Sequence, residues 1–272
     1  MGRNVAVIGI GNMAKAIIGG VVSSNEDVSQ ILLYDKNPAQ YAGLPTDSRI
    51  SFYKASSVAE AIDKADCVLI SVKPQNYEEV LAEMKNVVHH AEKLYISIGA
   101  GITADSVSES LGGACVVRVL PNVPMIIGKG VSVICENPAV SKEDFEFVCA
   151  VFRCAGSVLL IQESEMNRII GVTSSSPAYV FQFINAIYQG ALAQGLPDSK
   201  LLEAICDVVI GSAQLLKQSE DTPETWIARV ASKGGTTEQA LAVLRDYHFD
   251  DAMITAMRAC TRRADELGSK KQ

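Results

Sequence analysis

Residues 4–20 read N-V-A-V-I-G-I-G-N-M-A-K-A-I-I-G-G, and this stretch decides the fold of the chain. Residues 5–8 are short and apolar, as in a strand that is buried on both faces. A G-x-G-x-x-A pattern follows and opens a helix over residues 13–22. In a dinucleotide-binding turn the first glycine permits the tight bend, the second lets the backbone approach a pyrophosphate, and the alanine lets the helix pack closely. With the pyrophosphate at the positive end of this helix, we predict cofactor contacts at Gly9, Gly11, Asn12, Met13 and Ala14.

Asp35 ends the next predicted strand, residues 31–34, about twenty residues beyond the glycine motif. A carboxylate at this point bonds the hydroxyls of the adenosine ribose and favours NAD(H). The neighbouring Lys36 and Asn37 could instead hold the 2′-phosphate of NADP(H), provided that Asp35 turns away. The residues therefore leave both cofactors open.

Composition narrows the function classes. The 272 residues allow two domains, and a net charge of −7 gives no electrostatic footprint for nucleic acid or an anionic membrane. No apolar run is long enough to span a bilayer, and the first strand begins so early that it leaves no room for a signal peptide. The seven cysteines are scattered without a C-x-x-C pair, which predicts no metal site and favours a reduced, cytoplasmic protein.

Strand and helix patterns alternate through the first half of the chain. The predicted strands are residues 5–8, 31–34, 50–53, 67–72, 94–98, 115–119, 130–135 and 157–161. This alternation predicts an α/β fold with a Rossmann-like, mainly parallel, doubly wound sheet. The β signal vanishes after Ile161. We therefore divide the chain into a dinucleotide-binding domain, residues 1–162, and an all-helical domain, residues 163–272.

Two predicted helices of the second half, residues 177–194 and 201–216, carry apolar side chains almost all round. A helix that is apolar on every side must be buried on every side. A domain of roughly 110 residues has little room for two such helices. We therefore predict that they pack against a second copy of the chain, in a dimer.

The segment Ser232-Lys-Gly-Gly-Thr-Thr237 precedes a helix that starts near Glu238. Hydroxyls before a helix are commonly caps, but two glycines exceed what a cap needs. Exposed amides at a helix N-terminus bind anions, so we predict a carboxylate site here, with the hydroxyl of Thr237 beside it. The similar segment 173–177 is equally compatible with capping and with function. No histidine joins a motif, and no Tyr-x-x-x-Lys pair occurs.

The sequence resembles the pyrroline-5-carboxylate reductase family over essentially its whole length. The motifs that carry the resemblance are V-I-G-I-G-N-M-A-K-A-I-I-G-G at 7–20, V-K-P at 72–74, L-P-N-V-P at 120–124, S-S-P-A-Y-V-F at 175–181, G-L-P at 195–197 and S-K-G-G-T-T at 232–237. Members of this family reduce the cyclic imine 1-pyrroline-5-carboxylate to L-proline, the last step of proline biosynthesis. Their helical domains interlock into dimers, which often assemble into decamers. The resemblance implies the same activity and assembly here, with NADP(H) modestly preferred over NAD(H).

The resemblance also implies roles for individual residues. The loop that holds the substrate carboxylate and ring nitrogen corresponds to Ser232, Gly234, Gly235 and Thr237, and Glu220 corresponds to an acidic residue near that site. Segments near the ribose and nicotinamide correspond to Val72, Lys73, Pro74, Pro121 and Asn122. The chain departs from the family pattern at Ser174, which is usually glycine, and at Lys233, which is often proline.

The chemistry of an imine agrees with these residues. A protonated imine accepts a hydride without a strong general acid, so catalysis rests on placing the ring against the nicotinamide. A β-hydroxyacid dehydrogenase is the nearest rival, but the helical half lacks a G-x-x-x-K-x-x-x-N-type helix with a catalytic lysine. A non-catalytic dinucleotide-sensing protein is a second rival, against which the loop 232–237 argues.

Overall fold

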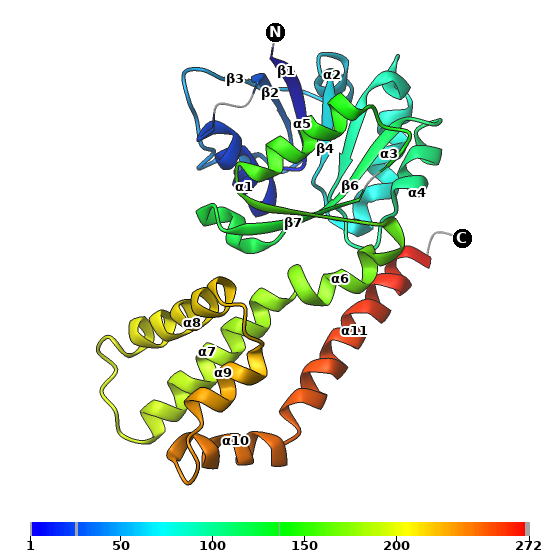
Figure 1. The fold of residues 1–272 in the computed structure, drawn as a ribbon. Coiled ribbons are helices and arrows are strands. Elements are labelled where there is room, and N and C mark those ends of the chain that lie inside the picture. The colour runs from blue at the N-terminus through cyan, green and yellow to red at the C-terminus, as the bar shows by residue number, and fades with distance from the viewer. Residues whose placement is uncertain (1, 25–26, 136, 270–272) are drawn as a thin grey trace. The chain divides into compact units, whose positions relative to one another are not determined.

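The computed structural model describes residues 2–24, 27–135 and 137–269, which form two compact units (Figure 1). The first unit contains the residues up to Ser175 together with those from Arg258 onward. The second contains Ser176–Met257. The predicted boundary at 162/163 follows the last predicted strand. The chain leaves the first unit thirteen residues later, after Ser175.

An eight-stranded sheet forms the centre of the first unit, in the order β3-β2-β1-β4-β5-β6-β7-β8. The strands are β1 (Arg3–Ile8), β2 (Val28–Tyr34), β3 (Ser51–Lys54), β4 (Cys67–Ile70), β5 (Leu94–Ser97), β6 (Cys115–Leu120), β7 (Gly130–Cys135) and β8 (Gly156–Ile161). All eight predicted strands are present, and the predicted Rossmann-like sheet is confirmed. Its first six strands are all parallel.

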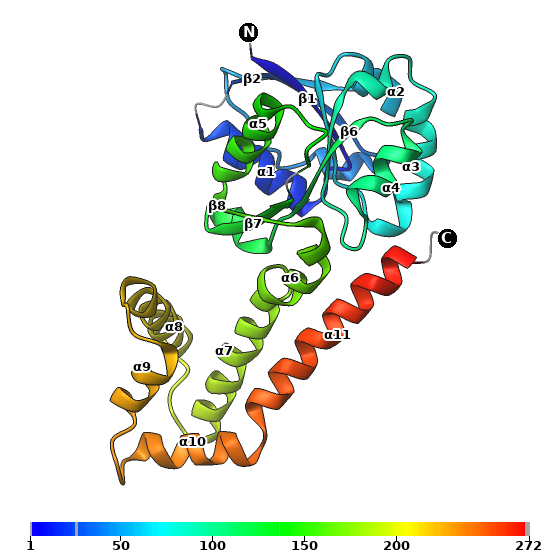
Figure 2. The same ribbon diagram turned by 45° about the vertical axis from the view of Figure 1, so that its right-hand side comes forward.

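Helices cover both faces of the sheet, as a doubly wound fold requires (Figures 1 and 2). One face packs against α1 (Asn12–Val22) and α5 (Lys142–Arg153), and the other against α2 (Val58–Asp63), α3 (Tyr77–Lys85) and α4 (Ala104–Ser110). Short 3₁₀ turns lie at Pro38–Tyr41, Pro74–Asn76, His90–Glu92 and Glu163–Glu165.

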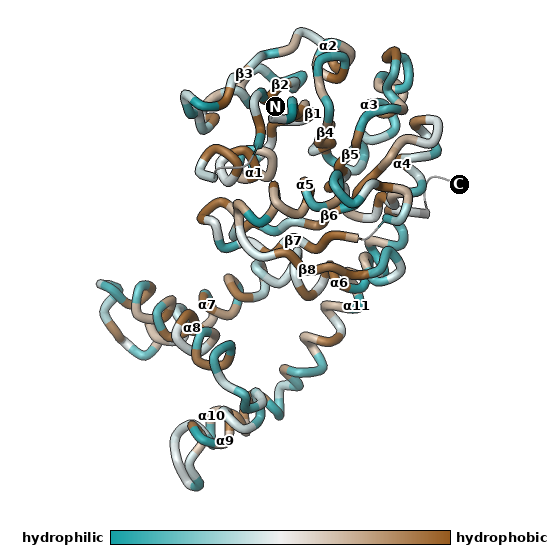
Figure 3. The backbone as a smooth tube through the Cα atoms, turned by 45° about the horizontal axis from the view of Figure 1, so that its top comes forward, coloured by the Kyte–Doolittle hydropathy of each residue, from teal (hydrophilic) through white to brown (hydrophobic). Residues whose placement is uncertain are grey.

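β7 runs antiparallel to β6, whereas β8 is again parallel to β7. The connection from β6 to β7 is the short 3₁₀ turn η4 (Val123–Ile127), too short for the crossover that a parallel pair needs. Figure 3 shows β7 and β8 as mainly hydrophobic. The turn η4 takes the place of a crossover helix between β6 and β7, and it packs against α1.

Arg118 of β6 is the largest of the fully buried side chains that the structure describes, 1% exposed. It bonds the sheet to the 3₁₀ turn Glu163–Glu165 and to the helix that follows it. Its Nη1 donates to Glu163 Oε1 at 2.7 Å and its Nη2 to Asn167 Oδ1 at 2.8 Å. Asn167 of α6 (Met166–Thr173) donates in turn to Asp265 Oδ1 at 2.8 Å, on α11 (Phe249–Ser269). A Cβ at Gly101 would lie 2.7 Å from the carbonyl oxygen of Ala264, so the end of α11 also packs closely on the loop after β5. The last part of α11 is thus held within the first unit.

The second unit is helical, with α7 (Ser176–Ala193), α8 (Leu201–Gln218), α9 (Pro223–Val230), α10 (Thr236–Asp246) and the beginning of α11. The helical second half predicted from the sequence is confirmed. α7 has no buried residue, and α8 buries only Ile205 among its described residues. Large side chains such as Phe181, Val208 and Ile210 are more than half exposed, at 59%, 67% and 54%.

Candidate active site

The turn between β1 and α1 has the backbone that its glycines predict. Gly9 adopts φ of +90°, and a Cβ there would lie 2.8 Å from the carbonyl oxygen of Ser71. Gly11 has an ordinary φ of −73°, and a Cβ there would meet nothing within 4 Å. Gly9 is therefore required by the turn itself, whereas Gly11 leaves open space above the start of α1.

The N-terminus of α1 is free of side chains that would satisfy it. Its N-cap, Gly11, provides no side-chain hydrogen bond, and the first turn contains no acidic residue. In contrast, the hydroxyls of Ser57, Thr103 and Ser141 cap α2, α4 and α5. The first N–H groups of a helix need partners and attract anions. The turn and the helix end therefore fit a pyrophosphate.

Asp35 lies directly after β2, and backbone amides fix its carboxylate. Oδ2 accepts from the N–H of Ile10 at 2.6 Å, and Oδ1 accepts from the N–H of Asn37 at 2.8 Å. The first of these bonds ties the carboxylate to the glycine turn. Each oxygen keeps a lone pair with which it can accept from a ribose hydroxyl.

A cleft of about 290 Å³ collects many of the predicted cofactor contacts at the carboxyl edge of the sheet. Ligands of open α/β sheets bind at this edge. The predicted residues among those that line it are Gly9, Gly11, Asp35, Lys36, Val72 and Lys73. Sequence reasoning missed others, including Gln40, Ser71, Asn76 and Glu79. Their polar side chains belong to no motif, so only the folded chain brings them to the cleft.

Lys36 lies at the rim of this cleft and is paired. Its Nζ is 2.6 Å from Oε1 of Glu79 and 3.4 Å from Oε1 of Glu83, both on α3. The hydrogen bond that Lys36 donates to Glu79 raises the pKa of Lys36 above its ordinary value. Asn37 uses its side chain to accept from the N–H of Ala39 at 3.1 Å.

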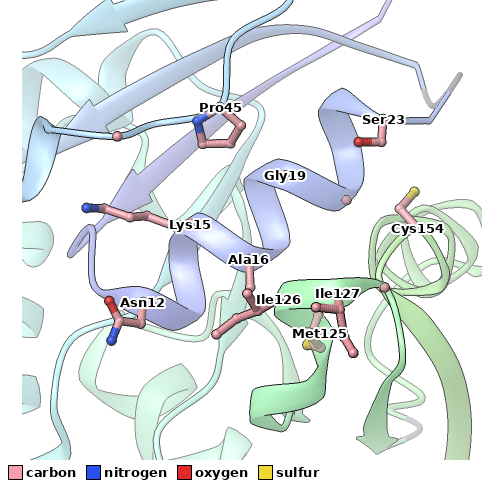
Figure 4. A pocket seen from close by; sticks show the side chains of 13 residues that line it. Asn12, Lys15, Ala16, Gly19, Ser23, Pro45, Met125, Ile126, Ile127 and Cys154 are labelled. Carbon is pink, nitrogen blue, oxygen red and sulfur yellow. The ribbon is translucent and has the colours of Figure 1, made fainter. Parts of the chain in front are cut away.

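Asn12 lines a second, larger cleft of about 610 Å³ on the flank of α1 (Figure 4). Ala16 and Gly19 of α1 form one wall, and Ile126 and Ile127 of η4 lie against them. The two isoleucines are 62% and 75% exposed. Of the predicted cofactor contacts only Asn12 lies here, so this cleft is distinct from the one that contains Asp35.

Asn122, at the end of β6, is buried and engaged on both ends of its amide. Nδ2 donates to the carbonyl of Thr173 at 2.9 Å, and Oδ1 accepts from the N–H of Val131 at 2.8 Å. Pro121 beside it is also buried, whereas Pro74 starts the 3₁₀ turn that leads into α3. The Asn122 side chain thus connects the end of α6 with the start of β7.

The segment 232–237, called the loop 232–237 here, consists of the connection after α9 and the first two residues of α10, Thr236 and Thr237, in the second unit. Gly234 adopts φ of +74°, and the N–H of Gly235 donates to the Ser232 carbonyl at 2.9 Å. A Cβ at Gly235 would lie 2.6 Å from Oγ of Ser232. Ser232 is exposed and Thr237 is partly exposed. Both glycines are therefore required by the loop geometry, beyond the needs of a cap.

The start of α10 already attracts a carboxylate from its own chain. Gly235 is the N-cap and provides no side-chain hydrogen bond. Glu238 instead turns back, and its Oε2 accepts from the N–H of Gly234 at 2.8 Å. The amide of Gly234 thus has a carboxylate as its partner.

Glu220 lies in the turn before α9, and its side chain is exposed. Hydrogen bonds of the neighbouring residues hold this turn. Ser219 Oγ accepts from the N–H of Asp221 at 3.0 Å and from Nε1 of Trp226 at 3.0 Å. Arg229 pairs with Asp221 and lies over the ring of Trp226, 4.7 Å from its centroid.

In the described part of the chain, no group of three or more His, Cys, Asp or Glu side chains has an arrangement that could hold a metal ion. Within the same residues, no helix is long and apolar enough to cross a membrane.

Comparison with known proteins identifies relatives of both halves. The family model described as pyrroline-5-carboxylate reductase dimerisation matches residues 163–267, and the model described as NADP oxidoreductase, coenzyme F420-dependent, matches residues 4–101. The pyrroline-5-carboxylate reductase of Escherichia coli (strain K12) is 34% identical over 269 residues, which cover 98% of this chain and 99% of that protein.

Two solved structures match this chain over nearly its whole length. A 1-pyrroline-5-carboxylate reductase from the human pathogen Streptococcus pyogenes has a TM-score of 0.87 at 27% identity, over 97% of this chain and 99% of its own. The pyrroline carboxylate reductase of Plasmodium falciparum, solved with NADP bound, has a TM-score of 0.85 at 23% identity, over 98% of each chain.

Proposed function

This chain belongs to the pyrroline-5-carboxylate reductase family, and we propose on that premise that it reduces 1-pyrroline-5-carboxylate to L-proline with a nicotinamide dinucleotide. The observation that carries the proposal is the presence of two helix N-termini that start after glycine, each suited to an anion. One lies beside Asp35 in a dinucleotide-binding turn, and the other follows the loop 232–237.

The cofactor is held by the glycine turn and the cleft at the carboxyl edge of the sheet. The start of α1 takes the pyrophosphate, with Gly9, Gly11, Asn12, Met13 and Ala14 as the contacts of this turn. Asp35 accepts from the adenosine ribose, and Lys36 and Asn37 lie beside it. Val72, Lys73, Pro74, Pro121 and Asn122 remain our proposed contacts toward the nicotinamide ribose, although the amide of Asn122 is already engaged by backbone.

Both NADPH and NADH serve as reductants in this proposal. The predicted preference for NADPH required that Asp35 turn away, and the two backbone amides that hold Asp35 oppose such a turn. We therefore expect any preference for NADPH to be small. Steady-state kinetics with each cofactor at saturating imine measures it.

The substrate carboxylate is held by the loop 232–237. The backbone amide of Gly234 and the hydroxyl of Ser232 face it, and the positive end of α10 adds to the attraction. Gly235 shapes the loop, because its N–H already donates to the Ser232 carbonyl. Thr237 hydrogen-bonds the ring nitrogen, and Glu220 is the acidic residue nearest to this group in our proposal. The incoming carboxylate replaces Glu238 at the amide of Gly234.

A bound, reduced nicotinamide supplies the hydride. The chain contributes position, because a protonated imine is electron-poor enough to accept hydride without a dedicated acid. Thr237 keeps the nitrogen, and hence one face of the ring, in a fixed orientation. The lack of a histidine or a Tyr-Lys pair in the proposed site is consistent with an imine substrate.

The protein is a homo-oligomer, and we infer a dimer built on α7 and α8. Their exposed apolar side chains support this, since an interface of obligate partners resembles a domain core cut in half. From the family resemblance we infer that these dimers associate further into a decamer. The seven cysteines are thiols, which supports our inference of a location in the reducing cytoplasm.

The decisive experiment is a proline-forming assay with 1-pyrroline-5-carboxylate and each reduced cofactor. We expect L-proline to appear in step with cofactor oxidation. If the reduced cofactor is oxidised in the presence of the keto form of a β-hydroxyacid but not of the imine, the result would favour a β-hydroxyacid dehydrogenase. Cofactor binding without turnover on any substrate would favour a sensing protein.

A further inference from the structure

Lys36 follows Asp35 in the sequence and lines the cofactor cleft, where it already pairs with carboxylates of α3. Glu79 and Glu83 lie one helical turn apart on α3, and both carboxylates reach the Nζ of Lys36, at 2.6 and 3.4 Å. Glu79 and Lys36 both line the 290 Å³ cleft, whereas Glu83 does not. A cation that pairs with two carboxylates has little attraction left for a third anion.

Asp35 adds a second, fixed negative charge at the same end of the cleft. Its two bonds to backbone amides leave the carboxylate beside the place of the adenosine ribose. The 2′-phosphate of NADP(H) bears about two negative charges at neutral pH, as other phosphate monoesters do. It would meet two carboxylates here, Asp35 and Glu79, and a lysine that must first leave its partner. The 2′-hydroxyl of NAD(H) needs only to donate to Asp35, with the Lys36–Glu79 pair intact.

We propose that Glu79 is the residue that sets discrimination against the 2′-phosphate, by holding Lys36 in an ion pair. The inference rests on the proposed function in one respect, that the dinucleotide occupies this cleft. Helix α3 then takes part in cofactor choice, in addition to the glycine motif and Asp35. Glu79 is a positioning residue in this account, since it acts mainly through Lys36.

The test is a comparison of binding constants for NADP⁺ and NAD⁺, measured by calorimetry on the full chain without imine. Glu79→Gln removes the charge and keeps the shape, and the exposure of this side chain makes the fold insensitive to the change. We expect Glu79→Gln to tighten NADP⁺ by about three- to tenfold, the scale of one partly solvated charge interaction, and to leave NAD⁺ within about twofold.

Glu78→Gln is the matched control. Glu78 precedes Glu79 in the first turn of α3, is exposed, and does not line the cleft. Glu78→Gln changes the net charge of the protein by the same amount as Glu79→Gln. Because Glu78 lies outside the cleft, we expect the ratio of the NADP⁺ and NAD⁺ binding constants to stay as in the unmodified protein. A shift as large as that of Glu79→Gln would show a general charge effect and would overturn the proposal.

The double variant Lys36→Ala/Glu79→Gln tests the route through Lys36. We expect it to lose most of the gain in NADP⁺ affinity that Glu79→Gln produces. A gain that persists without Lys36 would contradict the proposal and would point to Lys73, the other lysine of the cleft. If neither dinucleotide binds the unmodified chain, the cofactor site itself is wrong, which is a separate failure from an unchanged ratio.

Discussion

Two helix N-termini in this chain begin after glycine, and their differences separate two kinds of anion site. α1 begins after Gly11, and α10 begins after Gly235; neither has a side-chain cap. At α1 the space above the helix is open and its first turn carries no acidic residue. At α10 the nearby amide of Gly234 is occupied by the carboxylate of Glu238.

In the proposed function, these two uncapped helix ends serve ligands of different charge and size. A pyrophosphate is large and needs a helix end that no side chain obstructs. A single carboxylate is small, and a glutamate from the first turn can hold its place until the substrate arrives.

Gly11→Asp should close the open site. The backbone of Gly11, at φ −73°, accepts any residue, and aspartate is a favourable N-cap. The helix should therefore be as stable as before, whereas the new charge repels a pyrophosphate and should weaken dinucleotide binding by about a thousandfold, the scale of a close like-charge contact. Calorimetry and thermal unfolding measure the two effects separately. Equal dinucleotide affinity in the variant would show that the pyrophosphate lies elsewhere.

Thr237→Ala should affect only the second site. Loss of one positioning hydrogen bond to the ring nitrogen should lower kcat/KM for the imine by about a hundredfold. Dinucleotide affinity should stay unchanged because the cofactor contacts belong to the first unit. A variant with weaker cofactor binding and normal imine kinetics would mean that the loop holds the other ligand.

Glu238→Gln should sharpen the comparison by making α10 resemble α1. The amide of Gly234 loses a charged internal acceptor, so the substrate carboxylate meets less competition and less repulsion. We expect KM for the imine to fall by about threefold with kcat little changed, since hydrogen bonds to charged groups exceed neutral ones modestly. A rise in KM would instead identify Glu238 as a contact that supports the substrate.

Much of the fold was predictable because parallel strands buried on both faces read as short apolar runs bounded by turn residues. Helix starts were also readable, since Ser57 and Thr103 accept from the N–H groups three residues on, as their spacing indicates. Gly9, Gly234 and Gly235 were found because a positive φ or a close approach disfavours any other residue there, whereas only the motif spacing pointed to Gly11.

The remainder depends on contacts between residues that are distant in the sequence. Arg118 breaks an apolar strand pattern, and its partner Glu163 lies 45 residues away. The contact of Asn167 with Asp265 spans 98 residues and returns the end of α11 to the first unit. The pairing of Lys36 with Glu79 spans 43 residues and changes the meaning of a lysine that, by sequence, suited a phosphate. No local pattern predicts such pairs.

In the proposed function the helix ends after Gly11 and Gly235 hold different reactants, and a crossed measurement of both ligands distinguishes them. The dissociation constant of NADP⁺ and the KM for 1-pyrroline-5-carboxylate are determined for the unmodified chain, Gly11→Asp and Thr237→Ala. We expect Gly11→Asp to weaken NADP⁺ binding strongly and Thr237→Ala to leave it unchanged while impairing use of the imine. If both variants weaken NADP⁺ to the same extent, the two helix ends do not serve separate ligands and the account is wrong.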